Sequence, residues 1–401
     1  MFKFLFLKFL KNKKFKGLLH LSFAEKNYIF GEKISNEEEA NLISSINIRV
    51  INKEFFKQVI LFGDTGLGEA YFLKEFETDD IKKLLQWFIQ NKEVLPGFRR
   101  RKFSHIFFEW AKFLLYLSHL KNKNTIEGSK KNIQAHYDIS NNFYQLWLDK
   151  TMTYSSAVFN EAEDLETGQL NKYRKICESI NLKKDDRLLE IGTGWGGFAM
   201  YAVKNFGCHV TTTTISQEQF SYAKNKITEE GLAASIDLQF KDYRDLEGIY
   251  DKIVSIEMME AIGHKYVPAF IAKCNSLLAE GGKICLQFIT YPDKDFTAYL
   301  KNTGFIKKYI FPGGELLSLG QVKKELTNNN LMVNLVESIG QDYAKTLNIW
   351  RNNFLAKKDE ILALGFSEEN FRMWLYYFVY CEVGFASAYI DDVQVAIHKN
   401  K

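Results

Sequence analysis

The stretch RLLEIGTGWGGFAM, residues 187–200, decides the fold. A short apolar run from Leu188 to Ile191 ends in a cluster of glycines between Gly192 and Gly197, after which helix-forming residues begin. This succession of strand, tight turn and helix is typical of the first βαβ unit of a nucleotide-binding domain. The loop alone leaves three alternatives open: it holds a pyrophosphate, it holds the methionine end of S-adenosylmethionine (SAM), or it only makes a sharp turn.

Strands and helices alternate around this loop. The apolar patterns predict helices that end near 206 and span 216–230 and 266–278, and strands near 187–192, 209–215, 236–240, 252–256 and 283–290. Such alternation predicts a parallel sheet covered by helices, with its ligand at the carboxyl ends of the strands. We therefore expect an α/β fold with a Rossmann-like, doubly wound sheet.

The length and composition predict two domains. The chain has 401 residues, of which 46% are hydrophobic and 15% aromatic, enough for more than one core. Residues 46–91 have the pattern of a compact α+β segment, and the polar stretch 121–132 is the expected linker. The sequence predicts an α+β domain over 1–125 and a larger domain, which contains the glycine loop, over 126–401.

The charge is unevenly distributed along the chain. A formal net charge of +4 is too mild to indicate a nucleic-acid partner, and no apolar run reaches the roughly 18 to 20 residues of a membrane span. Residues 1–17 carry six lysines and no acid, and residues 99–124 predict a basic amphipathic helix. Both segments are typical of contact with an anionic membrane surface, although a basic tail and an interdomain helix are the alternatives. The domain over 1–125 is therefore the expected lipid- or membrane-docking domain.

The cysteines predict neither a metal site nor a disulfide framework. Five cysteines lie far apart, without a CxxC pair or a nearby cluster of histidines. A reduced environment is the default for such a chain. We expect a cytoplasmic protein that is peripheral on the inner face of the cytoplasmic membrane.

The residues beyond the loop favour SAM over a nicotinamide cofactor. A dinucleotide site usually has an acid about 20 residues past its loop, but the stretch HVTTTTIS, residues 209–216, has none. Glu190 ends the first strand, where an acid suits the charged methionine portion of SAM. Thr214 and Gln219 suit the ribose, and Asp242 and Tyr243 suit the adenine.

Several separate segments carry a resemblance to a known family. They are GDTGLGEAY, SKKNIQAHYDISNNFYQLWLD, TMTYSSAVF, LLEIGTGWGGF, VSIEMMEAIGHKY, KYIFPGG, QDYAKTLNIW and YCEVGFASAYIDDVQV. The chain resembles the cyclopropane-fatty-acyl-phospholipid synthases. The resemblance implies a class I SAM-methyltransferase fold and transfer of a methyl or methylene group from SAM to the double bond of an unsaturated acyl chain in a membrane phospholipid. A methyltransferase for a soluble small molecule is the alternative, and a homodimer is a candidate assembly.

The resemblance also implies the residues of the SAM site. The set comprises the tyrosine and serine of the TYS segment, the glycine loop and the polar residues at the next two strand ends: Tyr154, Ser155, Glu190, Gly192, Gly194, Trp195, Gly196, Thr214, Gln219, Asp242, Tyr243 and Arg244.

The chemistry of the family requires a base that removes a proton after methyl transfer. The resemblance implies a bicarbonate ion held by a glutamate, a tyrosine, a histidine and a cysteine-containing segment. Glu260 and Tyr343 match the first two positions, whereas Gln287 replaces the histidine and Ser156 the cysteine. These departures leave open whether bicarbonate binds and whether the product is a cyclopropane or a branched chain.

Two further residues belong to the predicted catalytic set or lie beside it. Glu257 precedes Glu260 by three residues, so one of the two is expected to be the base or its anchor. Cys381 matches a cysteine near the end of the family's sequences, with a buried structural thiol as the alternative.

Overall fold

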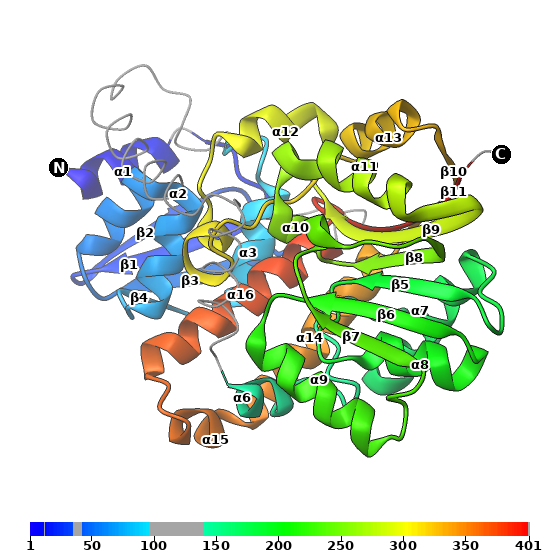
Figure 1. Ribbon diagram of the computed structural model, residues 1–401. Helices are drawn as coiled ribbons and strands as arrows, with labels where there is room; N and C mark the ends of the chain where they lie inside the picture. The colour runs from blue at the N-terminus through cyan, green and yellow to red at the C-terminus, as the bar shows by residue number, and fades with distance from the viewer. Residues whose placement is uncertain (12, 35–41, 96–139, 162, 400–401) are drawn as a thin grey trace. The chain divides into compact units, whose positions relative to one another are not determined.

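The computed structural model describes residues 1–11, 13–34, 42–95, 140–161 and 163–399 (Figure 1). The chain forms two compact units. One contains the described residues within 1–120 together with 302–310 and 358–387, and the other contains the described residues within 121–301 together with 311–357 and 388–401. The predicted boundary at 125/126 and the predicted helix over 99–124 lie outside the described residues. The inclusion of 302–310 and 358–387 in the first unit has no counterpart in the sequence prediction.

The first unit contains a four-stranded sheet in the order β2-β1-β3-β4. β1 is antiparallel to β2 and parallel to β3, and β4 is antiparallel to β3. The elements of this unit are α1 (Phe2–Lys11), β1 (Leu18–Phe23), β2 (Lys26–Phe30), β3 (Ser45–Val50), α2 (Glu54–Phe72), β4 (Phe76–Thr78), α3 (Ile81–Gln90), the π-helix η5 (Ile306–Ile310), α15 (Lys358–Ala363) and α16 (Glu368–Ala386).

A glycine allows close packing inside the first unit. A Cβ atom at Gly68 on α2 would lie 2.5 Å from the ring of Phe305 and 2.8 Å from the ring of Tyr376 on α16. These distances are shorter than a normal carbon contact, so the absence of a side chain lets the aromatic rings approach the backbone of α2. The ring of Phe305 in turn lies 4.7 Å from that of Tyr376.

The second unit is built on a seven-stranded sheet in the order β10-β11-β9-β8-β5-β6-β7. Its strands are β5 (Arg187–Ile191), β6 (His209–Thr214), β7 (Ile236–Phe240), β8 (Tyr250–Ile256), β9 (Leu278–Thr290), β10 (Leu331–Ser338) and β11 (Asp391–Lys399). The five strands from β5 to β9 are parallel, which confirms the predicted α/β class. β11 is antiparallel to both β9 and β10, so the sheet is mixed at this side.

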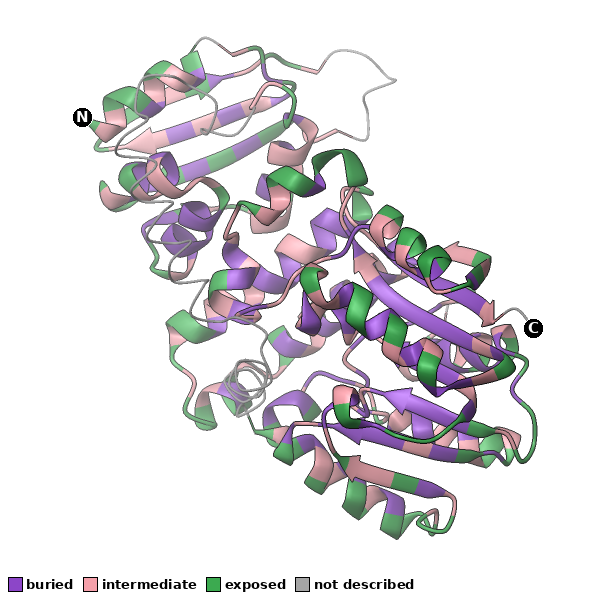
Figure 2. Ribbon diagram, turned by 45° about the horizontal axis from the view of Figure 1, so that its top comes forward, coloured by how far each residue is buried: buried purple, intermediate pink, exposed green. Residues whose placement is uncertain are grey.

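Helices cover both faces of the larger sheet. Side chains that alternate along β5 point to opposite faces: Leu188 packs with α7, α8 and α9, whereas Leu189 packs with α11 and α13. Figure 2 shows the strands of this sheet buried over much of their length and the outer faces of the helices exposed. The bounds are α6 (Asn141–Gln145), α7 (Leu165–Ser179), α8 (Gly197–Phe206), α9 (Gln217–Glu229), η3 (Tyr243–Asp245), α10 (Met259–Ile262), η4 (His264–Tyr266), α11 (Val267–Leu277), α12 (Asp293–Leu300), α13 (Leu319–Asn328) and α14 (Gly340–Ala356).

Among the described residues, no helix combines the length and the apolar character that a membrane crossing needs.

Candidate active site

The glycine loop between β5 and α8 needs its glycines. Gly192, Gly194 and Gly196 have φ angles of 105°, 53° and 90°, which glycine adopts at little cost. The backbone nitrogens of Gly192 and Thr193 donate to the carbonyl oxygen of Thr213 at 3.1 and 2.9 Å. These bonds tie the loop to the end of β6.

The loop borders a cavity of about 180 Å³ at the carboxyl ends of β5, β6, β7 and β8. This is the edge of the sheet at which the sequence predicts the ligand. The structure brings together at this cavity all residues of the predicted SAM site except Gly196, which instead precedes the first turn of α8.

Glu190 is the acid at the end of the first strand. Its side chain is only 2% exposed, and Oε2 accepts a hydrogen bond from Thr212 Oγ1 at 2.5 Å. Burial raises the pKa of Glu190 to about 8, because desolvation penalises the charged form. A cationic ligand in the cavity would favour the ionised carboxylate.

Asp242 and Arg244, which also line the cavity, form a tight pair. Arg244 donates from Nε to Oδ1 of Asp242 at 2.8 Å and from Nη2 to Oδ2 at 3.0 Å. The guanidinium also lies 5.3 Å from the ring centre of Tyr243. On the neighbouring strand end, Thr214 Oγ1 donates to Gln219 Oε1 at 2.9 Å. These groups form a polar wall beside a flat ring.

A second cluster converges on the carboxylate of Glu257, which also lines the cavity. Oε1 accepts hydrogen bonds from the backbone nitrogen of Ser156 at 2.8 Å and from Gln287 Nε2 at 2.9 Å. Oε2 accepts from the hydroxyl of Tyr343 at 2.7 Å. The structure therefore brings together Ser156, Gln287 and Tyr343 of the predicted catalytic set, around an acid that sequence reasoning named only as an alternative to Glu260.

Glu260 lies one turn further, on α10. Its Oε1 accepts from the backbone nitrogen of Ile289 at 2.5 Å, while its buried Oε2 has no hydrogen-bond partner among the described residues. Burial, together with the nearby charge of Glu257, raises the pKa of Glu260 to about 8. Glu260 is therefore mostly protonated at neutral pH, and its unpaired Oε2 then does not carry a buried charge.

Asp392 on β11 joins the cluster through Gln287, whose Nε2 donates to Asp392 Oδ2 at 2.9 Å. Asp392 is fully buried, and burial with the charges of Glu257 and Glu260 raises its pKa well above the usual range. A hydrogen bond also links the Asp392 and Glu257 carboxyl groups. The titrations of Asp392 and Glu257 are therefore linked.

Lys172 on α7 is the buried cation of the cluster. Its ammonium donates to Ser155 Oγ at 2.6 Å, and the side chain has no exposed surface. Burial lowers the pKa of Lys172 to about 8, although the charges of Glu257, Asp392 and Asp149 oppose that decrease. Sequence reasoning missed Lys172 and Asp392, because a lysine inside a charged helical stretch and an acid in the pair Asp391–Asp392 give no signal of burial by themselves.

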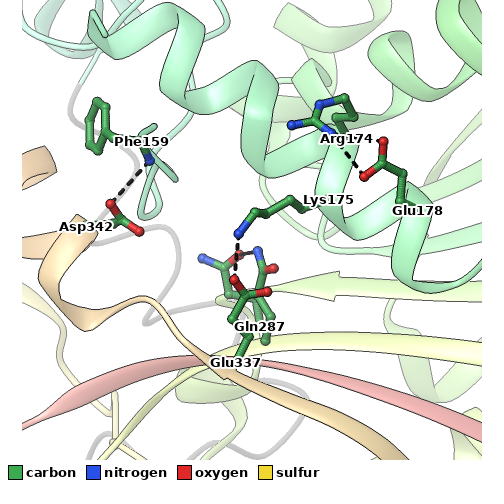
Figure 3. A network of polar contacts seen from close by, with 8 residues as sticks. Phe159, Arg174, Lys175, Glu178, Gln287, Glu337 and Asp342 are labelled. Carbon is green, nitrogen blue, oxygen red and sulfur yellow. Dashed lines mark hydrogen bonds and ion pairs between the residues drawn. The ribbon is translucent and has the colours of Figure 1, made fainter. Parts of the chain in front are cut away.

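The surroundings of this cluster are also polar (Figure 3). Gln287 Oε1 accepts from Gln394 Nε2 at 3.0 Å, and Glu337 on β10 pairs with Gln394 in the sheet. The ammonium of Lys175 lies 2.6 Å from Glu337 Oε1. Lys175 and Glu337 lie close to the cluster without contacting Glu257, so they are suitable positions for control variants.

Cys381 lies on α16, which belongs to the first unit, whereas the residues of the cavity and the cluster belong to the second unit. Burial raises the pKa of its thiol to about 12, so the thiolate is scarce at neutral pH. We expect Cys381→Ala to keep at least about half of the wild-type turnover, because an unionised thiol is no nucleophile. The rate of product formation at saturating SAM measures this, and a loss beyond about tenfold would restore Cys381 to the mechanism.

The fold and the cavity define a class I SAM-dependent methyltransferase. The family model described as mycolic acid cyclopropane synthetase matches residues 124–395. The chain belongs to this family, and it is a SAM-dependent transferase of one-carbon groups.

Individual relatives agree with this membership. Tuberculostearic acid methyltransferase UfaA1 of Mycobacterium tuberculosis is 36% identical over 278 residues, which cover 67% of this chain and 65% of that enzyme, just under two thirds of its length. Cyclopropane-fatty-acyl-phospholipid synthase of Escherichia coli K12 is 34% identical over 356 residues, or 88% of each chain. The solved structure of mycolic acid cyclopropane synthase CmaA1, complexed with SAH and CTAB, is 32% identical, has a TM-score of 0.64, and covers 67% of this chain and 98% of its own.

Proposed function

We propose that this enzyme transfers the methyl group of SAM to the double bond of an unsaturated acyl chain in a membrane phospholipid, which gives a cyclopropane or a methyl- or methylene-branched chain. The observation that carries the proposal is that one cavity is lined both by the groups expected to hold SAM and by Glu257. Glu257 is the centre of a cluster that can accept a proton.

The residues present suit SAM. The buried Glu190 can pair with a positive charge, and Asp242 with Tyr243 offers an acceptor and a ring face at the adenine end. SAM supplies an electrophilic methyl group when it is bound. The chain's own contribution is to orient the reactants and to exclude water, which matters because an alkene is a weak nucleophile and its cation reacts with water.

Aromatic rings pack near Tyr154, which lines the cavity. The ring of Tyr154 lies 5.3 Å from that of Trp350 and 6.2 Å from that of Phe311, and the ring of Tyr343 lies 6.1 Å from that of Trp350. Aromatic faces stabilise a nearby cation by about 2 kcal/mol when water is excluded. We therefore assign Tyr154, Phe311 and Tyr343 to stabilisation of the carbocation. Tyr309, another aromatic residue of the KYIFPGG segment, belongs to the first unit.

The experiment that tests the function is mass spectrometry of lipid products. Vesicles of unsaturated phospholipid are incubated with the full-length protein and SAM labelled in its methyl group. We expect acyl chains that gain the mass of one CH₂ group for the cyclopropane or methylene products, with release of S-adenosylhomocysteine. Labelled soluble small molecules alongside unmodified lipid would favour the alternative substrate class.

The N-terminal helix supports peripheral attachment to the membrane. Phe6 and Leu10 of α1 are buried. The ring centre of Phe6 lies 5.6 Å from that of Phe55 and 5.5 Å from that of Phe56, both in the first turn of α2. The other side exposes Phe4 by 67% and Leu5 by 44%. Lysines at positions 3, 8 and 11 accompany these side chains. An apolar face with adjacent lysines suits the headgroup region of an anionic bilayer, here proposed as the inner face of the cytoplasmic membrane.

We expect Lys3→Glu/Lys8→Glu/Lys11→Glu to reduce binding to anionic vesicles by about tenfold or more, since each lysine near the surface contributes about 1 kcal/mol. Co-sedimentation with vesicles that contain phosphatidylglycerol measures this, with Lys57→Glu on α2 as the matched control. Binding that is insensitive to added salt and to the three charge reversals would show that α1 is not the docking element.

A further inference from the structure

Glu257 occupies the hydrogen-bond donors that the resemblance assigns to a bicarbonate ion. The backbone nitrogen of Ser156 and the hydroxyl of Tyr343 each have one hydrogen, and both donate to Glu257. The amide of Gln287 has two, which it donates to Glu257 and Asp392. Every hydrogen of these three donors is used, so a separate bicarbonate ion would find none of them available.

The local charge also disfavours an added anion. Glu257, Glu260 and Asp392 are close enough for each to affect the pKa of another. Lys172 is the buried cation whose charge acts on Glu257. Lys172 already compensates the charge of Glu257, so another negative ion in this desolvated site would add a charge that the same ammonium cannot also offset. The residues present do not fit bicarbonate.

Glu257 belongs both to the polar cluster and to the lining of the cavity. It lines the cavity together with Glu190 and Gly192 of the glycine loop, and it follows directly after the end of β8. Its backbone has a φ angle of 47°, which is uncommon for a residue other than glycine. Three hydrogen bonds hold the side chain in this position.

We propose that Glu257 is the proton acceptor of this enzyme and takes the place of bicarbonate. The proposal rests on the proposed methyl transfer to an alkene and names the base for it. Tyr343, Gln287 and the backbone of Ser156 then position the base rather than an exchangeable ion. Asp392 is a positioning residue that accepts the second hydrogen bond of the Gln287 amide.

The step balances without an added reactant. The π electrons form a bond to the methyl carbon, the bond between that carbon and sulfur breaks, and sulfur keeps its electron pair as a thioether. The remaining carbocation loses a proton to a carboxylate oxygen of Glu257, and the electrons of the broken C–H bond form either the ring bond or a new double bond. The proton leaves for solvent as the product is released.

A glycine at position 257 provides a sharp test, because it tolerates the positive φ angle and vacates the space in front of the three donors. Turnover of the full-length wild type, Glu257→Gln, Glu257→Gly and the control Glu337→Gln is measured on unsaturated phospholipid vesicles. Each is assayed in buffer freed of carbon dioxide and in the same buffer with added bicarbonate. Binding of ¹³C-bicarbonate is followed separately by NMR line broadening, and SAM affinity by calorimetry.

We expect wild-type and Glu337→Gln turnover to change by less than about threefold on bicarbonate addition, and Glu257→Gln to lose about 100-fold or more with SAM affinity retained. Added bicarbonate should raise the turnover of Glu257→Gly by about tenfold or more. The NMR line of ¹³C-bicarbonate should broaden in the presence of that variant but not of the wild type. Larger stimulation of the wild type, equal broadening with wild type and Glu257→Gly, or an active Glu257→Gln would overturn the proposal. If the wild type forms no methylated lipid at all, the proposed function fails, and the comparison of broadening still decides the role of Glu257.

Discussion

Replacement of Lys172 by methionine is expected to lower methyl transfer at pH 7 by about 100-fold, and to restore part of the activity as the pH rises. Burial raises the pKa of Glu257, and the charge of Lys172 opposes that increase. Without the ammonium the pKa of Glu257 rises further, so less of the ionised base is present at pH 7. The acidic limb of the pH profile should therefore move to higher pH.

The other groups around Glu257 are unchanged in Lys172→Met, so a shift of the pH profile reports the loss of Lys172. Tyr343 on α14, Asp392 on β11 and Glu260 on α10 all remain in the variant. The variant loses the cation and its hydrogen bond to Ser155 Oγ. Lys175→Met is the matched control, since Lys175 lies on the same helix and pairs with the half-exposed Glu337. The profile of kcat against pH measures the shift. An unshifted limb with lower activity would indicate that Lys172 acts only through the packing of α7.

The stability of the same variant should also depend on pH. A buried acid whose pKa is raised by folding contributes stability below its unfolded pKa, and that contribution is lost as the pH rises through the folded pKa. The difference in Tm between wild type and Lys172→Met should therefore grow from pH 5.5 to pH 8. A difference that is constant over this range would mean that Glu257 and Asp392 do not respond to Lys172.

Replacement of Glu190 by glutamine is expected to weaken SAM binding at pH 8 by about 30-fold, because the carboxylate can no longer pair with a positive charge of the ligand in a buried site. In the wild type, the pKa of Glu190 near 8 means that the acid is protonated at pH 6.5. A cationic ligand binds the ionised form better and releases this proton. Wild-type affinity should therefore rise with pH up to about 8, by at most about tenfold per unit.

Isothermal calorimetry in buffers of different ionisation enthalpy measures both the affinity and the released proton. The glutamine variant should lose the part of the pH dependence that comes from Glu190, whereas titration of the ligand's own amino group persists in both proteins. Glu178→Gln, at an exposed glutamate on α7 that pairs with Arg174, is the control. Identical pH profiles for wild type and Glu190→Gln would separate Glu190 from the ligand.

Local sequence signals predicted the part of the fold that depends on short-range patterns. The strand at 187–191 and the helix at 197–206 lie within a few residues of their predicted positions, because an apolar run, a glycine turn and a helical pattern follow one another directly. β11 pairs instead with two strands distant in sequence. No local pattern reveals that it runs antiparallel between β9 and β10.

The candidate site divides in the same way. The residues of the cavity could be predicted because they follow the ends of successive parallel strands, which meet at one edge. The choice between Glu257 and Glu260 could not, because it depends on a single backbone angle and on donors that come from Ser156, Gln287 and Tyr343. Burial of Lys172 and Asp392 depends on packing between elements far apart in the chain.

The position of β11 has a consequence for biosynthesis. Because Asp392 lies on β11, which pairs with β9 and β10, the cluster of acids around Glu257 is incomplete until residue 392 has left the ribosome. A translation product that stops before this residue would carry the glycine loop without the complete arrangement of acids. Such fragments should be inert toward cellular lipids rather than leaky alkylating agents.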